Sequence, residues 1–220
     1  MHFQIPLVYP ILDASMIPDT DRATFLQYLG ESLTHAGVTL LEYRNKTGSE
    51  EELKSDARIL RGAMTPEKVK LILDDRSDLV GAVKFDGVHV DAGDASPAEA
   101  RRVVGPHRIV GTFGGSEDLL PSVFTQPADY FSIGPVFPTA TKQSSNEPID
   151  IDGVHHLRRQ AGPKVVLVAV GGITLETATA VLDAGANSVA VAAGLFRASD
   201  PAAEFRRWMR ELGRSAPVPG

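Results

Sequence analysis

The sequence contains no cysteine, which excludes disulfide bonds, thiol nucleophiles and cysteine-based metal sites. It also lacks a basic excess, since the formal net charge is −6 and the pI is near 5.5. General binders of nucleic acid or anionic membranes carry a basic surface, so anion binding by this chain has to be local. No apolar run approaches the length of a membrane span, and the first residues lack the basic segment and apolar core of a secretory signal. We therefore expect a cytoplasmic protein that binds neither nucleic acid nor membrane.

What the sequence does contain is a regular alternation of two hydrophobic patterns. Its 220 residues are 43% hydrophobic, enough for one sizeable core. Short apolar stretches predict strands at 5–12, 39–43, 69–73, 87–90, 108–112, 130–133, 165–170 and 188–192. Helical spacing and capping residues predict helices at 19–36, 49–62, 77–83, 116–124 and 175–184, one that starts at Ser96 and one from Asp200 to near Gly213. Gly114-Gly115 and residues 194–196 are expected to form turns.

Eight strands that alternate with helices favour a (β/α)8 TIM barrel over an open doubly wound sheet. We expect this α/β fold to form a single domain over residues 1–214, with a disordered tail at 215–220. The segment 143–152 is polar and irregular, which makes it a candidate lid.

Charged and hydroxyl side chains follow several of the predicted strands. In a TIM barrel the residues just after each strand converge on one mouth. The candidates are Arg44, Lys46, Asp74, Asp75, Asp94, Thr139, Thr141 and Lys142. The last three lie within a stretch of four residues in the loop after the sixth strand, and their hydroxyl and ammonium groups are suited to phosphate oxygens.

Two short turns after the last two strands complete the predicted mouth. They contain Gly171-Gly172 and Ala193-Gly194, and each precedes a helix start where backbone N–H groups can bind a phosphate monoester. The opposite half of the mouth gathers cations and carboxylates, an arrangement that needs something between them. A Mg²⁺ ion held by Asp75 and Asp94, with a diphosphate between this ion and the cations, balances both sets of charges. Those cations are Arg44, Lys46 and Lys142.

The chain resembles the thiamine phosphate synthase family through five motifs spread over most of its length. They are Glu42-Tyr-Arg-Asn-Lys46, Asp74-Asp75-Arg76-Ser-Asp-Leu79, Asp86-Gly-Val-His89, Gly134-Pro-Val-Phe-Pro-Thr-Ala-Thr-Lys142 and Gly171-Gly172-Ile173. The loop that ends in Lys142 is the most specific of them. Enzymes of that family join hydroxymethylpyrimidine diphosphate to thiazole phosphate, release diphosphate and form thiamine phosphate.

The resemblance implies a role for each matching residue. Asp75 and Asp94 would bind Mg²⁺, and Glu42 would lie beside the pyrimidine. The catalytic cations that bind the diphosphate would be Arg44, Lys46 and Lys142, with Asp74 nearby and Thr139 and Thr141 lining the pyrimidine and diphosphate site. Gly172, Ala192 and Ala193 would offer backbone N–H groups to the thiazole phosphate. The implied mechanism is a dissociative substitution that needs no protein nucleophile, because positioning and electrostatics stabilise the departing diphosphate.

The sequence also departs from the family pattern. Glu42 and Asp74 stand where the family has Gln and Asn, and Ala193 replaces a Ser. Phe113 and Gly115 replace a Ser and a His after the fifth strand. These changes leave open whether the pyrimidine diphosphate is still the substrate.

Two other functions stay open at this point. The first is an isomerase of the thiazole tautomerase type, in which the metal carboxylates are lost and a histidine follows the fifth strand; Asp75, Asp94 and Gly115 disfavour it. The second is a non-catalytic barrel that binds thiazole phosphate or thiamine phosphate. His89 is expected to be a supporting residue inside the barrel, and the chain is a possible homo-oligomer.

Overall fold

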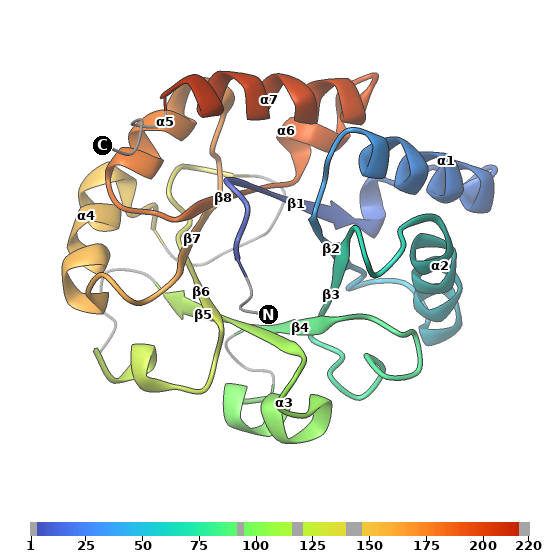
Figure 1. Cartoon of the computed structure of the whole chain (residues 1–220), viewed down its shortest axis with the longest axis horizontal. Helices are drawn as coiled ribbons and strands as arrows, with labels where there is room; N and C mark the ends of the chain where they lie inside the picture. Colours follow the sequence, from blue (N-terminus) through green and yellow to red (C-terminus); the bar gives the residue numbers. More distant parts are fainter. Residues whose placement is uncertain (1–3, 92–94, 116–120, 140–146, 216–220) are drawn as a thin grey trace.

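The computed structural model describes residues 4–91, 95–115, 121–139 and 147–215. Eight parallel strands follow one another in sequence order and close into a barrel, because β8 pairs with β1. The helices form an outer ring around these strands (Figure 1). The predicted TIM barrel is confirmed.

The strands are short and each is largely buried. They are β1 (Val8–Asp13), β2 (Leu40–Arg44), β3 (Lys70–Asp74), β4 (Gly87–Val90), β5 (Ile109–Gly115), β6 (Tyr130–Ile133), β7 (Leu167–Val170) and β8 (Ser188–Val191). The helices are α1 (Arg22–His35), α2 (Glu50–Ala63), α3 (Pro97–Val104), α4 (Asp150–Ala161), α5 (Leu175–Asp183), α6 (Ala193–Phe196) and α7 (Pro201–Ser215), with 3-10 helices η1 (Ala14–Met16) and η2 (Pro121–Thr125). Within the described ranges, none of these helices combines the length and the apolar character that crossing a membrane requires.

Alternation along the strands divides the core into two layers. Successive residues of a strand point to opposite faces, so one set fills the barrel and the other packs under the helices. The inner set is Tyr9, Leu40, Ile72, Ile109, Tyr130, Val168 and Ala190. Leu41 and Tyr43 of β2 belong to the outer set, which packs against the helices. The inner register therefore continues from Leu40 to Glu42 and Arg44, which places two polar side chains inside the barrel near its mouth.

Helix starts follow the capping residues. Ser96 and Glu99 form the predicted capping box of α3, with Pro97 at its first position. Ser49 accepts a hydrogen bond from the backbone N–H of Glu52 at the start of α2.

Several local predictions were wrong. Residues 77–83 form successive turns and no helix, because Asp75 (φ 62°) and Lys84 (φ 59°) interrupt helical geometry on both sides of a short connection. Gly114-Gly115 continues β5, since Gly115 pairs with Ile133 of β6. Residues 194–196 belong to the short helix α6.

Three other predictions fall partly outside the described residues. Of the predicted helix 116–124, the described part is η2, and 116–120 lie outside the description. In the candidate lid, 150–152 form the first turn of α4, whereas 143–146 are not among the described residues. α7 continues to Ser215, and 216–220 are likewise outside the described ranges.

The end of the barrel opposite the mouth is tied by a hydrogen-bonded unit that we call an arginine clasp. In the first clasp Arg61, near the end of α2, donates to the backbone carbonyls of Met64 and Val69 and to Oδ2 of Asp86 at 2.7 Å. The same oxygen of Asp86 accepts the backbone N–H of Leu71 at 2.9 Å. The clasp thus joins a helix end to the starts of β3 and β4.

The clasp is repeated twice further along the chain. In the second clasp Arg101 and the backbone N–H of Val110 donate to Asp129. In the third clasp Arg158 and the backbone N–H of Leu167 donate to Asn187. The second clasp joins the starts of β5 and β6, and the third clasp joins the starts of β7 and β8. These Arg, Asp and Asn side chains therefore serve the fold at the end away from the mouth, where stability rather than chemistry is the usual role.

Candidate active site

Polar side chains from four neighbouring strands meet at the carboxyl end of the barrel. Asp13, Arg44 and Asp74 are the last residues of β1, β2 and β3, and Asp91 directly follows β4. The register aligns Asp13 with Arg44 and Asp74 with His89. Strand ends fixed in this way hold the side chains together at one half of the mouth.

Two cations at the end of β2 are held between carboxylates. Arg44 forms an ion pair with Asp13, and its Nε lies 3.5 Å from Oδ2 of Asp74. Nζ of Lys46 lies 3.3 Å from the same oxygen of Asp74, and Lys46 also pairs with Asp75. Two cations thus lie among three carboxylates, and their charges balance only in part.

The carboxyl group of Asp13 has a lowered pKa and stays ionised. Burial acts to raise the pKa of Asp13, but hydrogen bonds from the backbone and hydroxyl of Ser15 and from Arg44 outweigh it and lower the pKa. The negative charge on Asp13 thus keeps the guanidinium of Arg44 in place at the mouth.

Three carboxylates form an acidic cluster beside these cations. Oxygens of Asp74, Asp75 and Asp91 all lie within 4.8 Å of one another, a grouping that could hold a metal ion. Oδ2 of Asp74 and Oδ1 of Asp75 are buried and receive no hydrogen bond from the described residues. Asp75 has a left-handed backbone (φ 62°), a conformation more common for Asp than for most residues. Carboxylate oxygens that are buried and receive no hydrogen bond fit a hard divalent cation.

A hydrogen-bonded chain runs across the floor of the mouth. The Tyr9 hydroxyl donates to Oε2 of Glu42 at 2.8 Å, and the hydroxyls of Tyr9 and Tyr130 are 2.9 Å apart. Because the proton of Tyr9 is used on Glu42, Tyr130 donates to Tyr9, and Nδ1 of His89 at 3.2 Å donates to Tyr130. Gly111 makes room for this arrangement, since a Cβ there would lie 2.0 Å from the Tyr130 ring.

Burial sets the protonation of this floor. It raises the pKa of Glu42 to about 7, since the charged form is desolvated and the negative charge of Asp74 adds to the effect. Burial alone would lower the pKa of His89, but the negative charges of Glu42, Asp91 and Asp74 outweigh it and raise the pKa. Burial therefore favours the neutral form of Glu42, whereas the surrounding carboxylates favour the charged form of His89.

The other half of the mouth is built from backbone. Gly172 (φ 65°) lies in the turn after β7, where a Cβ would lie 2.5 Å from the carbonyl oxygen of Pro138. The N–H of Phe137 donates to the carbonyl of Gly171 at 3.0 Å. The loop after β6, which continues to Thr139, is thus packed on the turn that contains Gly172.

The described part of the mouth therefore contains most of the residues predicted from the sequence. Glu42, Arg44, Lys46, Asp74 and Asp75 lie together, whereas Thr139 and Gly172 belong to the opposite half. Ala192 and Ala193 lie at the start of α6, directly after β8. Asp94, Thr141 and Lys142 lie outside the described residues.

Four residues of the mouth were missed by the sequence interpretation. They are Tyr9, Asp13, Asp91 and Tyr130. A signal for two of them was present, because Tyr9 lies in the strand predicted at 5–12 and Asp13, directly after it, continues the same alternating inward register.

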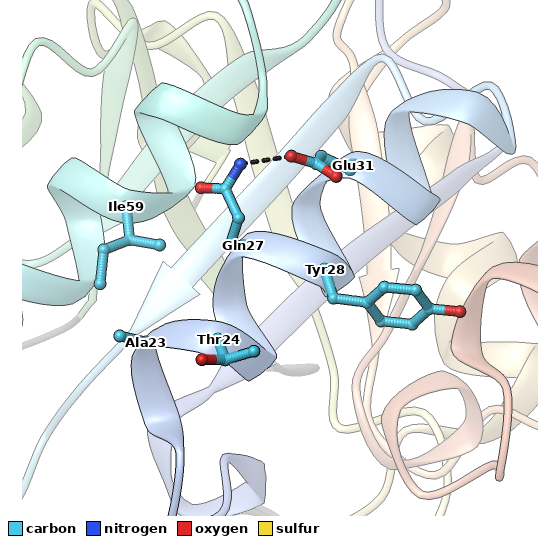
Figure 2. Close-up of a pocket in the computed structure, with 6 residues that line it drawn as sticks. All are labelled: Ala23, Thr24, Gln27, Tyr28, Glu31 and Ile59. Atoms are coloured by element: carbon cyan, nitrogen blue, oxygen red, sulfur yellow. Dashed lines mark hydrogen bonds between the residues drawn. The ribbon is translucent and has the colours of Figure 1, made fainter.

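A separate hollow of about 450 Å³ lies on the outer surface of α1 and α2 (Figure 2). Its lining residues are Ala23, Thr24, Gln27, Tyr28, Glu31 and Ile59. The α1 residues among them lie on the solvent side of the helix, whereas Leu26, Leu29 and Leu33 face the core. The carboxylate of Glu31 already accepts a hydrogen bond from Gln27, and the lining offers neither a second carboxylate nor a cation. The hollow therefore lacks the paired cations and carboxylates that the barrel mouth contains.

Comparisons with known protein families and sequences find relatives of this chain. A family model described as thiamine monophosphate synthase matches residues 8–195. The thiamine-phosphate synthase of Koribacter versatilis is 44% identical over 193 residues, covering 87% of this chain and 90% of that protein. The thiamine-phosphate synthase of Azorhizobium caulinodans is 37% identical over 192 residues, covering 86% of this chain and 90% of that protein.

Solved structures give the same picture. A thiamine phosphate pyrophosphorylase from Pyrococcus furiosus superimposes with a TM-score of 0.80 at 25% identity, covering 96% of each chain. A 3-hexulose-6-phosphate synthase superimposes with a TM-score of 0.67 at 16% identity, covering 96% of this chain and all of the other, a likeness of fold alone.

Proposed function

The chain belongs to the thiamine monophosphate synthase family, and we propose that its barrel mouth joins hydroxymethylpyrimidine diphosphate to thiazole phosphate, releasing diphosphate. It is a transferase of thiamine biosynthesis. The observation that supports this site best is the set of two cations and three carboxylates on one side of the mouth. A glycine turn of the phosphate-binding type lies on the other.

The charged half of the mouth is the proposed diphosphate site. Arg44 and Lys46 bind the diphosphate oxygens, together with Lys142 as predicted from the sequence. We assign a Mg²⁺ ion to Asp75 and Asp94, with Asp74 and Asp91 close enough to contribute. Mg²⁺, when bound, supplies positive charge to the departing diphosphate. The cationic side chains do the same from the protein, so the leaving group departs without a protein nucleophile.

The floor and the backbone half position the two organic partners. Glu42, in its chain of hydroxyls with Tyr9 and Tyr130, is placed to orient the aminopyrimidine, and Thr139 with Thr141 lines the same site. Backbone N–H groups of Gly172, Ala192 and Ala193 hold the thiazole phosphate. The thiazole nitrogen then captures the pyrimidine carbocation, and the mouth contributes orientation and charge.

The isomerase alternative is not supported by the described residues. It requires a histidine after the fifth strand and no metal carboxylates. Gly115 ends β5 instead, and the acidic cluster is present.

The test is thiamine phosphate formation from the two substrates, with Mg²⁺ and with a chelator. We expect product from the wild type, and loss of product with chelator and in Asp75→Ala. Asp78→Ala is the matched control, since Asp78 lies on the same connection, is mostly exposed and pairs only with Arg76 among the described residues. Tight binding of thiazole phosphate without product from the wild type would contradict the transferase and favour a binding role.

Cytoplasmic location and a homo-oligomeric state stay predictions. Sedimentation of the purified chain tests the homo-oligomeric state.

A further inference from the structure

A buried carboxylate lies behind the mouth, between α1, α2 and β2. Asp56 of α2 is 2% exposed and lies on the helix side of the barrel wall. Nε of Arg22 donates to both of its carboxylate oxygens at 3.0 Å, and Nη2 donates to Oδ2 at 2.6 Å. The hydroxyl of Tyr43 donates to Oδ2 at 2.5 Å. A buried carboxylate is tolerated when it is paired and hydrogen-bonded in this way.

The network continues to the residue after β2. Nδ2 of Asn45 donates to the Tyr43 hydroxyl at 3.2 Å and to Oε1 of Glu52 at 2.9 Å. Its Oδ1 accepts the backbone N–H of Gly48 at 2.7 Å. Asn45 therefore fixes the connection between β2 and α2 as well as the end of the strand.

Residues 43 and 45 alternate with the two cations of the mouth. Side chains of successive residues in an extended segment point to opposite sides. Tyr43 is held on the helix side by Asp56, so the side chain of Arg44 projects to the mouth side. This matches the ion pair of Arg44 with Asp13. Beyond the strand, Asn45 is held by Tyr43 and Glu52, and Lys46 is placed at the mouth by its own ion pairs.

We propose that Asp56, Tyr43 and Asn45 are positioning residues that hold the end of β2 so that Arg44 and Lys46 meet the diphosphate of the substrate. This inference rests on the proposed function, because it takes these two cations as diphosphate ligands. None of the three positioning residues enters the mouth; they act through the backbone between them. Misplacement of binding groups by about 1 Å can cost on the order of 100-fold in rate.

The experiment compares Tyr43→Phe and Asn45→Ala with the wild type. Tyr43→Phe keeps the ring and removes the hydroxyl, so it should fold even if an Asp56 variant does not. The dissociation constant of inorganic diphosphate in the presence of Mg²⁺ and the KM of the pyrimidine diphosphate are measured. We expect both constants to rise on the order of 10-fold, the scale seen when a residue that orients a binding residue through a hydrogen bond is removed. The KM of thiazole phosphate should not change.

Asp86→Ala is the matched control for lost stability. Asp86 pairs with Arg61 as Asp56 pairs with Arg22, but in the clasp at the far end of the barrel. This variant should lower the melting temperature and leave diphosphate binding at the wild-type value. A second readout is a double-mutant cycle, in which Tyr43→Phe should add little to Lys46→Met if the hydroxyl acts through Lys46.

The outcomes separate the two proposals. Unchanged diphosphate binding in Tyr43→Phe and Asn45→Ala, with an active wild type, overturns the positioning role alone. Equal loss in Asp86→Ala overturns it as well, because the effect is then one of stability. A wild type that binds no diphosphate overturns the proposed function and this inference together.

Discussion

Lys46 shares its ammonium group between Asp74, at 3.3 Å, and Asp75, although both carboxylates belong to the acidic cluster that fits a metal ion. A divalent cation at that cluster would compete with the ammonium for the same oxygens. Diphosphate gives Lys46 an alternative partner of the right charge. We therefore expect the two ligands to be coupled, because diphosphate in the proposed site would draw Lys46 away from the acidic cluster.

Lys46→Met should accordingly move metal and diphosphate affinity in opposite directions. Without diphosphate, Mn²⁺ or Mg²⁺ should bind at least about 5-fold more tightly, since a unit charge 4 Å away is worth about 1 kcal/mol even in water. Diphosphate should bind more weakly, because one cation of its site is lost. Titration calorimetry with each ligand measures both constants. Lys54→Met is the control, since Lys54 pairs with Glu50 on α2. Weaker metal binding in Lys46→Met would contradict the competition.

Glu42→Gln should change how the stability depends on pH. Burial raises the pKa of Glu42 from 4.5 to about 7, so between these values the folded state holds a proton that the unfolded state has lost. Stability of the wild type therefore falls as pH rises through this window. The pKa of His89 is also raised, so the loss of its proton at higher pH lowers the stability in the same way. Glu42→Gln removes the carboxyl and should gain stability over the wild type at pH 8, up to about 3 kcal/mol, and less at pH 5.

Urea unfolding at a series of pH values measures this difference. Glu51→Gln on the exposed side of α2 reports the general effect of removing one negative charge. A Glu42→Gln curve parallel to that of the wild type between pH 5 and 8 would show that the buried carboxyl does not titrate there.

Gly172→Ala should damage the thiazole phosphate side of the mouth. The backbone is left-handed at this residue, and a Cβ would lie 2.5 Å from Pro138 O and 2.7 Å from Phe137 O. The turn must therefore shift, and we expect a KM for thiazole phosphate raised at least about 10-fold, on the scale of a misplaced binding group. Diphosphate binding should be unaffected.

Gly162→Ala is the control, because it changes a left-handed glycine without causing a steric clash. Gly162 has φ 75°, and a Cβ at this residue would meet no atom of the described residues within 4 Å. The substitution therefore carries only the conformational cost of about 1 kcal/mol. Its kinetic constants should equal those of the wild type. Equal kinetic effects of both substitutions would rule out a local role for Gly172.

The sequence was sufficient for the barrel because the relevant signals are local. Alternation of apolar stretches with capped helices needs no long-range information, and the Ser96 to Glu99 capping box spans four residues. The residues after the strands could also be placed at one mouth, since the fold itself imposes this convergence. Arg44 and Asp75 were found in that way.

What the sequence could not provide is the register that brings distant residues into contact. The hydroxyl contact between Tyr9 and Tyr130 depends on the closure of the barrel and on the missing side chain of Gly111. The partner of Arg44 depends on the alignment of β1 with β2, which makes Asp13 its neighbour. The helix predicted at 77–83 failed because backbone geometry at Asp75 took precedence over local helix preference.

The second and third arginine clasps together predict the effect of replacing Asp129 on stability. Asp129 accepts from Nη2 of Arg101 at 2.7 Å and from the N–H of Val110 at 2.8 Å through one oxygen. In the third clasp Asn187 does both tasks with a neutral amide oxygen. Asp129→Asn should therefore be tolerated, with a loss of at most about 1 kcal/mol for the partly exposed ion pair.

Asp129→Ala should cost more, about 1–3 kcal/mol, because it leaves the N–H of Val110 without this acceptor at the start of β5. Urea unfolding of the two variants measures both losses, and thiamine phosphate formation should be unchanged because the clasp lies at the end opposite the mouth. Equal losses for Asn and Ala would mean that the charge of Asp129, and not its shared oxygen, stabilises the clasp. A smaller loss of stability for Asp129→Asn than for Asp129→Ala would instead show that the shared acceptor oxygen stabilises the clasp. That explains how Asn and Asp can occupy the same position in successive units.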